Sequence, residues 1–345
     1  MEVITTFLQQ QALGFLPETA STIILFIIGL VLIIKGGDWF VDAAAWVAKV
    51  TGIPQFLVGA TIVSLATTLP ELLTSVFATM QGSTEIAIGN AVGSVTANVG
   101  LIMAISIAVL PMVMKDSSII FKGFIMIGAT LLLGLLCIGG YLSWWMALAL
   151  LAVLAYFTYL NIRDARTELA DTSDVVPMKS RKEIPVNIFK FLIGIIAIVI
   201  GAQLLVDTGT ELATLMGVSE KLIAITLVAI GTSLPELITT ITSLVKKQPG
   251  MSIGNIIGAN IIDMTLILPI CAFVSGGKLD VPMGTSAMTL GSVTLPSLVW
   301  LDIPVTALLM ALAIVPTIKH KKFHRWQGIC MMVVYVAYVV FVSSL

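Results

Sequence analysis

Two apolar stretches of the sequence repeat the same pattern around a carboxylate. VSLATTLPELLTSV, residues 63–76, returns as VAIGTSLPELITTI, residues 228–241, so Glu71 and Glu236 lie 165 positions apart. A charge at bilayer depth costs roughly 2.5 to 3.5 kcal/mol on insertion scales, and it is retained mostly where it binds an ion, relays protons or pairs. The duplication therefore predicts a chain built from two related halves that handles cations within a membrane.

The composition is typical of a polytopic membrane protein. Of the 345 residues 58% are hydrophobic and 11% charged, and the apolar runs are too many and too long for one water-soluble core. The net charge of −1, without a basic surface interleaved with aromatics, gives no indication of nucleic-acid binding. Cys137, Cys271 and Cys330 lack C-x-x-C spacing, which argues against a disulfide framework or a zinc site. We expect the lipid bilayer as partner, no cofactor and no obligate protein partner.

Glycines, prolines and charged clusters divide the chain into ten candidate membrane spans. These lie near residues 22–50, 53–81, 85–112, 118–137, 142–162, 188–216, 219–246, 250–275, 297–318 and 327–344. The segment from Arg163 to Asn187 separates two sets of five and is too short and too charged for a globular domain. The predicted organisation is an N-terminal extracytoplasmic segment at 1–21, a first five-helix repeat at 22–162, a cytoplasmic linker at 163–187 and a second five-helix repeat at 188–345.

The positions of Lys and Arg predict the orientation. With the N-terminus outside, 15 of the 18 basic residues, Lys122 among them, fall in cytoplasmic loops. Only Lys221 and Lys278 fall outside, with Lys35 inside the first span. Five spans per half make the second half enter the membrane from the opposite side. The predicted fold is therefore an all-α polytopic membrane protein of ten transmembrane helices in two inverted five-helix repeats, N-out and C-out, an arrangement of many secondary transporters.

The first motif of each half predicts a broken helix beside its carboxylate. Thr67 and Glu71 share a helix face, while Pro70 lacks an N–H and leaves the carbonyl of Ala66 without its helical partner. The second half repeats the device with Thr232, Pro235 and Glu236. Irregular backbone at bilayer depth is tolerated where it lines a cavity or a site.

The second motif of each half predicts a polar helix face that packs closely. Asn90, Ser94 and Asn98 recur every four residues, and Asn255, Ala259 and Asp263 match them at the same offset of 165. Small residues four apart let helices approach closely, which would bring these oxygens to the carboxylates. The small residues are Gly89 with Gly93, and Gly254 with Gly258.

Three carboxylates in apolar spans need cations, protons or basic partners, and no Lys or Arg lies in these segments. Bound cations are the simplest compensation, and calcium, which takes roughly six to eight oxygens, fits better than magnesium. Four other acidic residues are expected nearer the helix ends, where they cap helices or meet headgroups: Asp38, Asp42, Asp207 and Glu211. His320 and His324 have metal-like spacing but sit in KHKKFHR, a cationic loop that would repel a metal.

ATTLPELLTS with GNAVGSVTAN, and GTSLPELITT with GNIIGANIID, resemble the two alpha repeats of the cation/calcium exchanger superfamily, especially its prokaryotic sodium/calcium exchanger branch. The resemblance implies a multi-pass protein of the prokaryotic cytoplasmic membrane, with eight core helices crossed by two long tilted ones near 22–50 and 188–216. It implies that Glu71 and Glu236 are central carboxylates shared by Ca2+ and Na+, completed by Asn98 and Asp263. It further implies oxygen ligands at Thr67, Thr68, Thr232 and Ser233, backbone carbonyls at Ser64 and Ala229, and a side-chain ligand at Ser94.

Departures from the family pattern bear on the coupling ion. Ala259 stands where the second repeat usually has Ser, Ala66 replaces the usual Gly, and GSVTAN replaces the common GSN run. GTSLPE is nearer to sodium-coupled members than to proton-coupled ones, whose repeats show a GNxxE pattern. Antiport of Ca2+ against Na+ is the expected function and Ca2+/H+ antiport the alternative, while a cation channel or an intramembrane hydrolase is disfavoured. We expect no enzymatic activity, and the roles of residues 1–20 and of the connection 276–301 stay open.

Overall fold

The computed structural model describes residues 5, 7, 9, 17–111, 113, 117–171, 183–216, 231–283, 288–290 and 293–344. Within these ranges eight helices are long and apolar enough to cross a membrane, or nine if Gln55–Thr67 and Leu69–Met80, bent by 41°, form one span. The span predicted near 219–246 lies partly outside the described residues, so the number ten stays a prediction.

The helices account for most of the described chain. They are α2 (Glu18–Thr51), α3 (Gln55–Val58), α4 (Ser64–Thr67), α5 (Leu69–Met80), α6 (Thr84–Ala97), α7 (Ala104–Val109), α8 (Ser117–Leu136), α9 (Trp144–Asp171), α10 (Glu183–Leu215), α13 (Leu234–Val245), α14 (Pro249–Ile262), α15 (Leu268–Val274), α16 (Ile303–His320) and α17 (Arg325–Ser344). Wider π-helical turns interrupt them at η2 (Gly59–Val63), η3 (Asn98–Met103), η6 (Asp263–Ile267) and η7 (Leu298–Asp302), and a 3-10 turn forms η4 (Cys137–Gly139). The predicted linker 163–187 is helical at both ends, because α9 runs on to Asp171 and α10 begins at Glu183.

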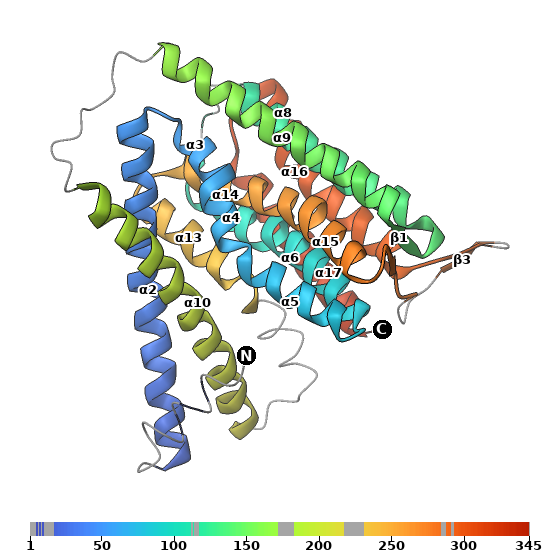
Figure 1. Cartoon of the computed structure of the whole chain (residues 1–345), viewed down its shortest axis with the longest axis horizontal. Coiled ribbons are helices and arrows are strands. Elements are labelled where there is room, and N and C mark those ends of the chain that lie inside the picture. The colour runs from blue at the N-terminus through green and yellow to red at the C-terminus, as the bar shows by residue number, and fades with distance from the viewer. Residues whose placement is uncertain are drawn as a thin grey trace.

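Two long helices, α2 and α10, cross each other at one side of the molecule (Figure 1). A Cβ atom on Gly36 of α2 would lie 2.9 Å from the carbonyl oxygen of Gly194 of α10, so the two backbones touch directly. This pair agrees with the two long helices that the family resemblance implies.

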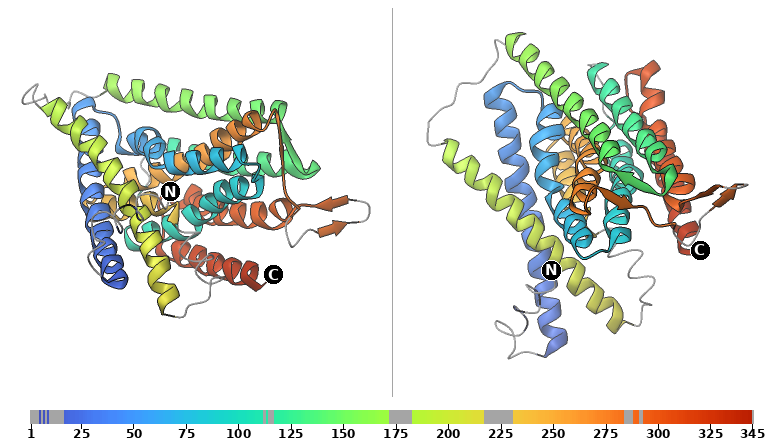
Figure 2. Two further views of the ribbon diagram at one scale, coloured as in Figure 1. Left: turned by 60° about the horizontal axis from the view of Figure 1, so that its bottom comes forward. Right: turned by 45° about the vertical axis from the view of Figure 1, so that its right-hand side comes forward.

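The remaining helices form a compact bundle (Figure 2). The membrane span that contains α14 is 83% buried and the span that contains α6 is 72% buried, whereas the other full-length spans are 17–39% buried. The two helices that carry the polar faces therefore run through the protein interior. The outer helices present apolar side chains such as Val333, Val336 and Val340 of α17 to the surroundings.

Four short strands depart from the all-helical expectation. β1 (Tyr141–Ser143) pairs antiparallel with β2 (Lys278–Asp280), with Tyr141 opposite Asp280. β3 (Met288–Leu290) pairs antiparallel with β4 (Val293–Leu295) within the connection 276–301. Three-residue strands carry too little alternation to be recognised from sequence, and they tie loops together without changing the helical architecture.

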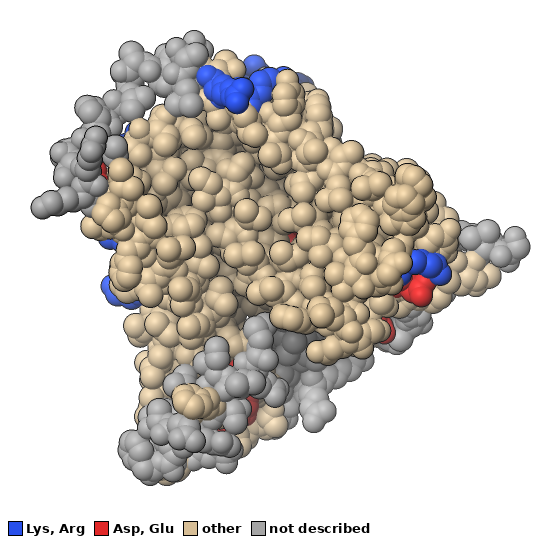
Figure 3. Space-filling view, in the orientation of Figure 1, with Lys and Arg blue, Asp and Glu red and all other residues tan. Residues whose placement is uncertain are grey.

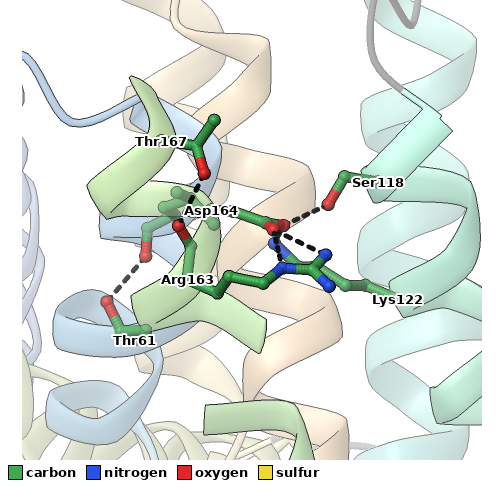
Figure 4. A network of polar contacts seen from close by, with 7 residues as sticks. Thr61, Ser118, Lys122, Arg163, Asp164 and Thr167 are labelled. Carbon is green, nitrogen blue, oxygen red and sulfur yellow. Dashed lines mark hydrogen bonds and ion pairs between the residues drawn. The ribbon is translucent and has the colours of Figure 1, made fainter. Parts of the chain in front are cut away.

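Charged side chains gather at the rim of the molecule. Figure 3 shows a face with few acidic or basic residues and Lys and Arg at its upper edge, as expected of a surface in lipid. Lys122 differs from its predicted place in a cytoplasmic loop, because its α8 side chain is 1% exposed and lies 2.8 Å from Asp164 of α9. Arg163 and Ser118 also contact Asp164 (Figure 4), which stabilises the buried charge.

Candidate functional site

The helix that carries Glu71 is interrupted three residues before this carboxylate, at Thr68. α4 ends at Thr67, Thr68 forms a turn, and α5 begins at Leu69 with Pro70 in its first turn. The 41° bend falls at this break. Since Pro70 has no N–H, the break follows from the sequence, and it leaves Glu71 in the first turn, where the helix dipole favours a negative charge.

The second half has the same construction in its described part. Gly231, Thr232 and Ser233 precede α13, which begins at Leu234 with Pro235 and Glu236 in its first turn. Glu236 therefore occupies the position in α13 that Glu71 occupies in α5. Ala229, a predicted backbone ligand, lies outside the described residues.

Asn98 and Asp263 each open a π-helical turn in the interior helices. Asn98 begins η3 after α6, and Asp263 begins η6 after α14. A π turn widens the helix locally and is frequent at functional sites. Both side chains are buried, and they occupy the same place in the two halves.

The three carboxylates are buried in the protein interior, and none of them forms an ion pair within the described residues. Glu71, Glu236 and Asp263 are each 1% exposed. Glu71 lies within electrostatic range of Glu236 and Asp263, and Asp263 lies within range of Glu236. Within the described residues, both carboxylate oxygens of Glu71 and of Glu236, Asp263 Oδ1 and Asn98 Oδ1 have no hydrogen-bond partner. Since burying an unpaired charge is very costly, this arrangement calls for a positive ligand.

Hydroxyl groups of the first half lie beside a carboxylate of the second half. Thr67 and Thr68 lie beside Glu236 of the other half. Thr68 Oγ1 donates to the Ser64 carbonyl at 2.6 Å, which fixes that turn. The buried Ser233 hydroxyl has no partner among the described residues. The two halves therefore supply oxygens to a common region.

Ser94, also predicted from the resemblance, lies close to the second half. Its hydroxyl is 3.4 Å from Thr232 Oγ1, and the residue is buried in α6. Ala259, at the matching place in α14, is fully buried and offers no side-chain oxygen. The polar lining of the region is therefore unequal in the two halves.

The sequence reasoning missed Ser75 and Thr239, which help to hold the site. Asn90 Nδ2 donates to the Glu71 carbonyl at 3.1 Å and to Ser75 Oγ at 2.9 Å. Asn255 Nδ2 donates to Thr239 Oγ1 at 3.0 Å, and Thr239 Oγ1 donates to the carbonyl of its own helix residue 236 at 3.0 Å. Their spacing, four residues after Glu71 and three after Glu236, places them on the same helix faces and was a usable signal.

The glycines of α14 lie where its backbone meets the first half. A side chain on Gly254 would collide with the Phe56 carbonyl oxygen, and one on Gly258 with the Ser64 hydroxyl. Gly89 and Gly93 of α6 have no described atom within 4 Å of the corresponding positions. Close approach is therefore a feature of the α14 pair in the described structure.

The donor set suits a hard cation only if neutral oxygens take part. Among the described residues no group of three His, Cys, Asp or Glu side chains is positioned to hold a metal ion. Calcium takes roughly six to eight oxygens at about 2.3 to 2.6 Å from carboxylates, carbonyls and amides. Broken helices and hydroxyl groups beside Glu71 and Glu236 offer oxygens of these kinds, so the residues fit a hard cation as cargo.

A cavity of about 990 Å³ adjoins the site. Pro70 and Thr74 of α5 and Thr232 line one side of it, while Asp207 and Glu211 of α10 line the other. The carboxylates of α10 accept hydrogen bonds from Thr5, Gln203, Gln9 and Thr22. The expectation that these two residues cap helices or meet headgroups is therefore wrong, because their side chains face the cavity.

An apolar helical bundle with a buried acidic site and an adjoining cavity defines a multi-pass integral membrane protein of the cation-exchanging class. The profile of the sodium/calcium exchanger protein family matches residues 21–163 and 186–344, so the chain belongs to that family. The predicted membership of the cation/calcium exchanger superfamily is confirmed.

Known proteins resemble the chain over most of its length. An uncharacterized membrane protein of Methanocaldococcus jannaschii is 30% identical over 90% of this chain and 94% of its own length. The sodium/calcium exchanger MaX1 of Methanosarcina acetivorans is 30% identical over 92% and 97%, respectively. A solved structure of the sodium-calcium exchanger NCX_Mj, soaked with Na+ and Sr2+, superposes with a TM-score of 0.77 at 27% identity, covering 93% of this chain and 99% of that one. These relatives are exchangers or membrane proteins by name.

Proposed function

We propose that the protein exchanges Ca2+ for Na+ across the prokaryotic cytoplasmic membrane by alternating access at the site around Glu71 and Glu236. One observation carries this proposal: both carboxylates are buried without an ion pair in the described part of the chain, Glu71 has no hydrogen-bond partner there, and only the hydroxyls of Thr67 and Thr68 lie beside Glu236. Cations are the simplest compensation for such charges. The names of MaX1 and NCX_Mj point to the same two ions.

Antiport follows from shared ligands. If Glu71, Glu236 and Asp263 must neutralise either one divalent ion or several monovalent ions, the two loads exclude each other. Asn98 and the oxygens of Ser64, Thr67, Thr68, Ser94, Thr232, Ser233 and Ala229 complete the proposed ligand set. The site then changes the side of the membrane that it faces only when Ca2+ or Na+ is bound, so one ion must replace the other in each cycle.

We further propose ten transmembrane helices in two inverted repeats, N-out and C-out. The α2–α10 crossing supports this, because Gly29 contacts Gly201 while Gly36 contacts Gly194. Gly194 and Gly201 are the positions that correspond to Gly29 and Gly36 at an offset of 165. Such a reciprocal contact between antiparallel helices is expected across a two-fold axis.

Proton coupling is the competing proposal within the same fold, because Ala259 gives no hydroxyl to the second half. The test is uptake of radioactive Ca2+ by proteoliposomes loaded with Na+, with K+ or with choline, and with an imposed pH gradient. Uptake that requires internal Na+ supports the proposal. Uptake driven only by the pH gradient would show that H+ and not Na+ is the coupling ion. Flux independent of every counter-ion gradient would indicate a channel.

The site variants Glu71→Gln and Glu236→Gln complete the test. Each removes one negative charge and keeps the shape of the side chain, so exchange should be lost while the protein stays folded. Ordinary Ca2+ flux in either variant contradicts the assignment.

A further inference from the structure

A lysine at the end of α13 bridges to the crossing helix α2. Lys246 Nζ lies 2.5 Å from Asp42 Oδ1 and 3.5 Å from Asp38 Oδ1, and it donates to the Asp38 carbonyl at 3.2 Å. Asp38 and Asp42 were expected to cap the helix or meet headgroups, and the structure pairs them with Lys246 instead. These contacts join α2 to α13, the helix that carries Glu236 in its first turn.

Helices α2 and α13 are also closely packed near this lysine, at Gly37. A Cβ atom on Gly37 of α2 would lie 2.9 Å from both Ile238 Cγ2 and Thr242 Oγ1 of α13. Glycine is therefore required for this approach. The contact leaves no room for a side chain between α2 and α13 at Gly37.

The corresponding place in the other half lines a cavity among the described residues. At the repeat offset of 165, Lys246, Asp42 and Gly37 correspond to Gln81, Asp207 and Ala202. All three of these residues line the cavity of about 990 Å³ between α5 and α10. Related parts of the two halves thus differ in both sequence and structure: the packed side has a lysine and a glycine, and the cavity side has a glutamine and an alanine.

We propose that Lys246 is a positioning residue for ion exchange, which latches α2 to α13 and holds the site closed on that side while the cavity side is open. This inference rests on the proposed alternating access. Opening on the Lys246 side requires α2 to move away from α13, which separates Lys246 from Asp38 and Asp42. Because the two carboxylates are 43% and 51% exposed, the ion pairs bias the equilibrium rather than lock it.

The first test compares Lys246→Gln with Lys247→Gln. Lys247 is the adjacent, exposed lysine and takes no part in the ion pairs with α2. In proteoliposomes with the protein in one orientation, Lys246→Gln should raise the apparent Ca2+ affinity on the Lys246 side about two- to fivefold and lower it by a smaller factor on the cavity side. Lys247→Gln should change neither. Equal losses on both sides, or no change, overturn the proposal.

A second readout is independent of transport. Thr242→Cys, in a chain with Cys330→Ser, places a thiol in the α2–α13 contact, while Cys137 and Cys271 are buried. A membrane-impermeant maleimide should label it about two- to fivefold faster when Lys246→Gln is added, and not faster with Lys247→Gln. An unchanged rate overturns the latch. If labelling responds although wild-type protein shows no Na+-dependent Ca2+ uptake, the proposed ions are wrong and the latch stands.

Charge reversal supplies the last control. Lys246→Asp places three negative charges together, and adding Asp42→Lys restores an opposite-charge pair. Labelling should rise in the single variant and return toward the wild-type rate in the double variant. A double variant that labels as fast as the single one contradicts a role for the ion pair.

Discussion

Gly36 of α2 and Gly194 of α10 lie backbone against backbone, and a Cβ atom on either would fall 2.9 Å from the carbonyl oxygen of the other. Gly29 of α2 and Gly201 of α10 make the same kind of contact about two helical turns away. The crossing therefore has small, smooth surfaces where other helix pairs have interlocking side chains. Such a surface lets the two helix backbones pack in direct contact.

We expect Gly36→Val to reduce exchange strongly, because the new side chain must displace the α10 backbone. Overpacking of this kind costs about 1–3 kcal/mol, which corresponds to a roughly five- to 150-fold lower population of the competent state. Initial rates of Ca2+ uptake in proteoliposomes measure the effect. Gly128→Val on the exposed face of α8, with no described atom within 4 Å of its Cβ position, is the matched control and should be active. Equal activity of the two variants would remove the crossing from the mechanism.

Replacing Glu71 by Gln should separate ion binding from folding. The buried carboxylate is repelled by Glu236 and Asp263, so its loss should leave the ion-free protein at least as stable in thermal unfolding. Ca2+ at a hundred times its dissociation constant stabilises a binding protein by about 2.7 kcal/mol, and this gain should disappear in Glu71→Gln. The exposed Glu85 provides the control, since Glu85→Gln should keep the Ca2+-dependent rise in melting temperature. A full Ca2+ response in Glu71→Gln contradicts the site.

Ala259→Ser should strengthen the dependence on Na+. Ala259 is fully buried at the position that corresponds to Ser94, and a hydroxyl there adds one oxygen to the second half. A net gain of one polar contact corresponds to a half-saturating Na+ concentration about two- to tenfold lower. Ser94→Ala should shift this concentration in the opposite direction. Ala129→Ser, which adds a hydroxyl at a buried place in α8, should leave it unchanged, and a shift of the same size there would make the effect nonspecific.

The site was largely predictable where rare residues interrupt apolar helices. Glu71 and Glu236 stand out because charges are costly in lipid, and Pro70 predicts the break at Thr68 because proline cannot donate to the preceding turn. The repeat offset then led to Asp263, which the structure buries with them. These conclusions depend only on local residue chemistry and spacing.

Contacts between distant segments were not predictable in the same way. The pair of Lys122 with Asp164 and the pairing of Tyr141 with Asp280 join residues whose spacing carries no periodic signal. Lys246 was assigned to a loop by its charge, and only the packing of α13 on α2 brings it to Asp42. Tertiary geometry decided these cases, because a side chain's local sequence does not specify its partner.

The proline within α16 leads to a last prediction about stability. Pro316 has no N–H for the Leu312 carbonyl, and the fully buried Gln327 of α17 donates Nε2 to Leu312 O at 2.9 Å and to Ala313 O at 2.8 Å. Gln327 Oε1 also accepts from the His324 N–H at 2.7 Å. Gln327→Leu leaves the Leu312 carbonyl without a partner, removes the bonds to Ala313 and His324, and should cost about 2 kcal/mol.

A double-mutant cycle tests whether the glutamine compensates for the proline. Pro316→Ala restores an N–H to the α16 ladder, so the Leu312 carbonyl regains a helical partner. Adding Gln327→Leu to that background should then cost about half as much as in the wild type. Thermal unfolding in detergent, with and without each change, gives the coupling free energy. An identical cost in both backgrounds would mean that Gln327 stabilises the α16–α17 junction through His324 and Ala313, and that the freed Leu312 carbonyl contributes nothing.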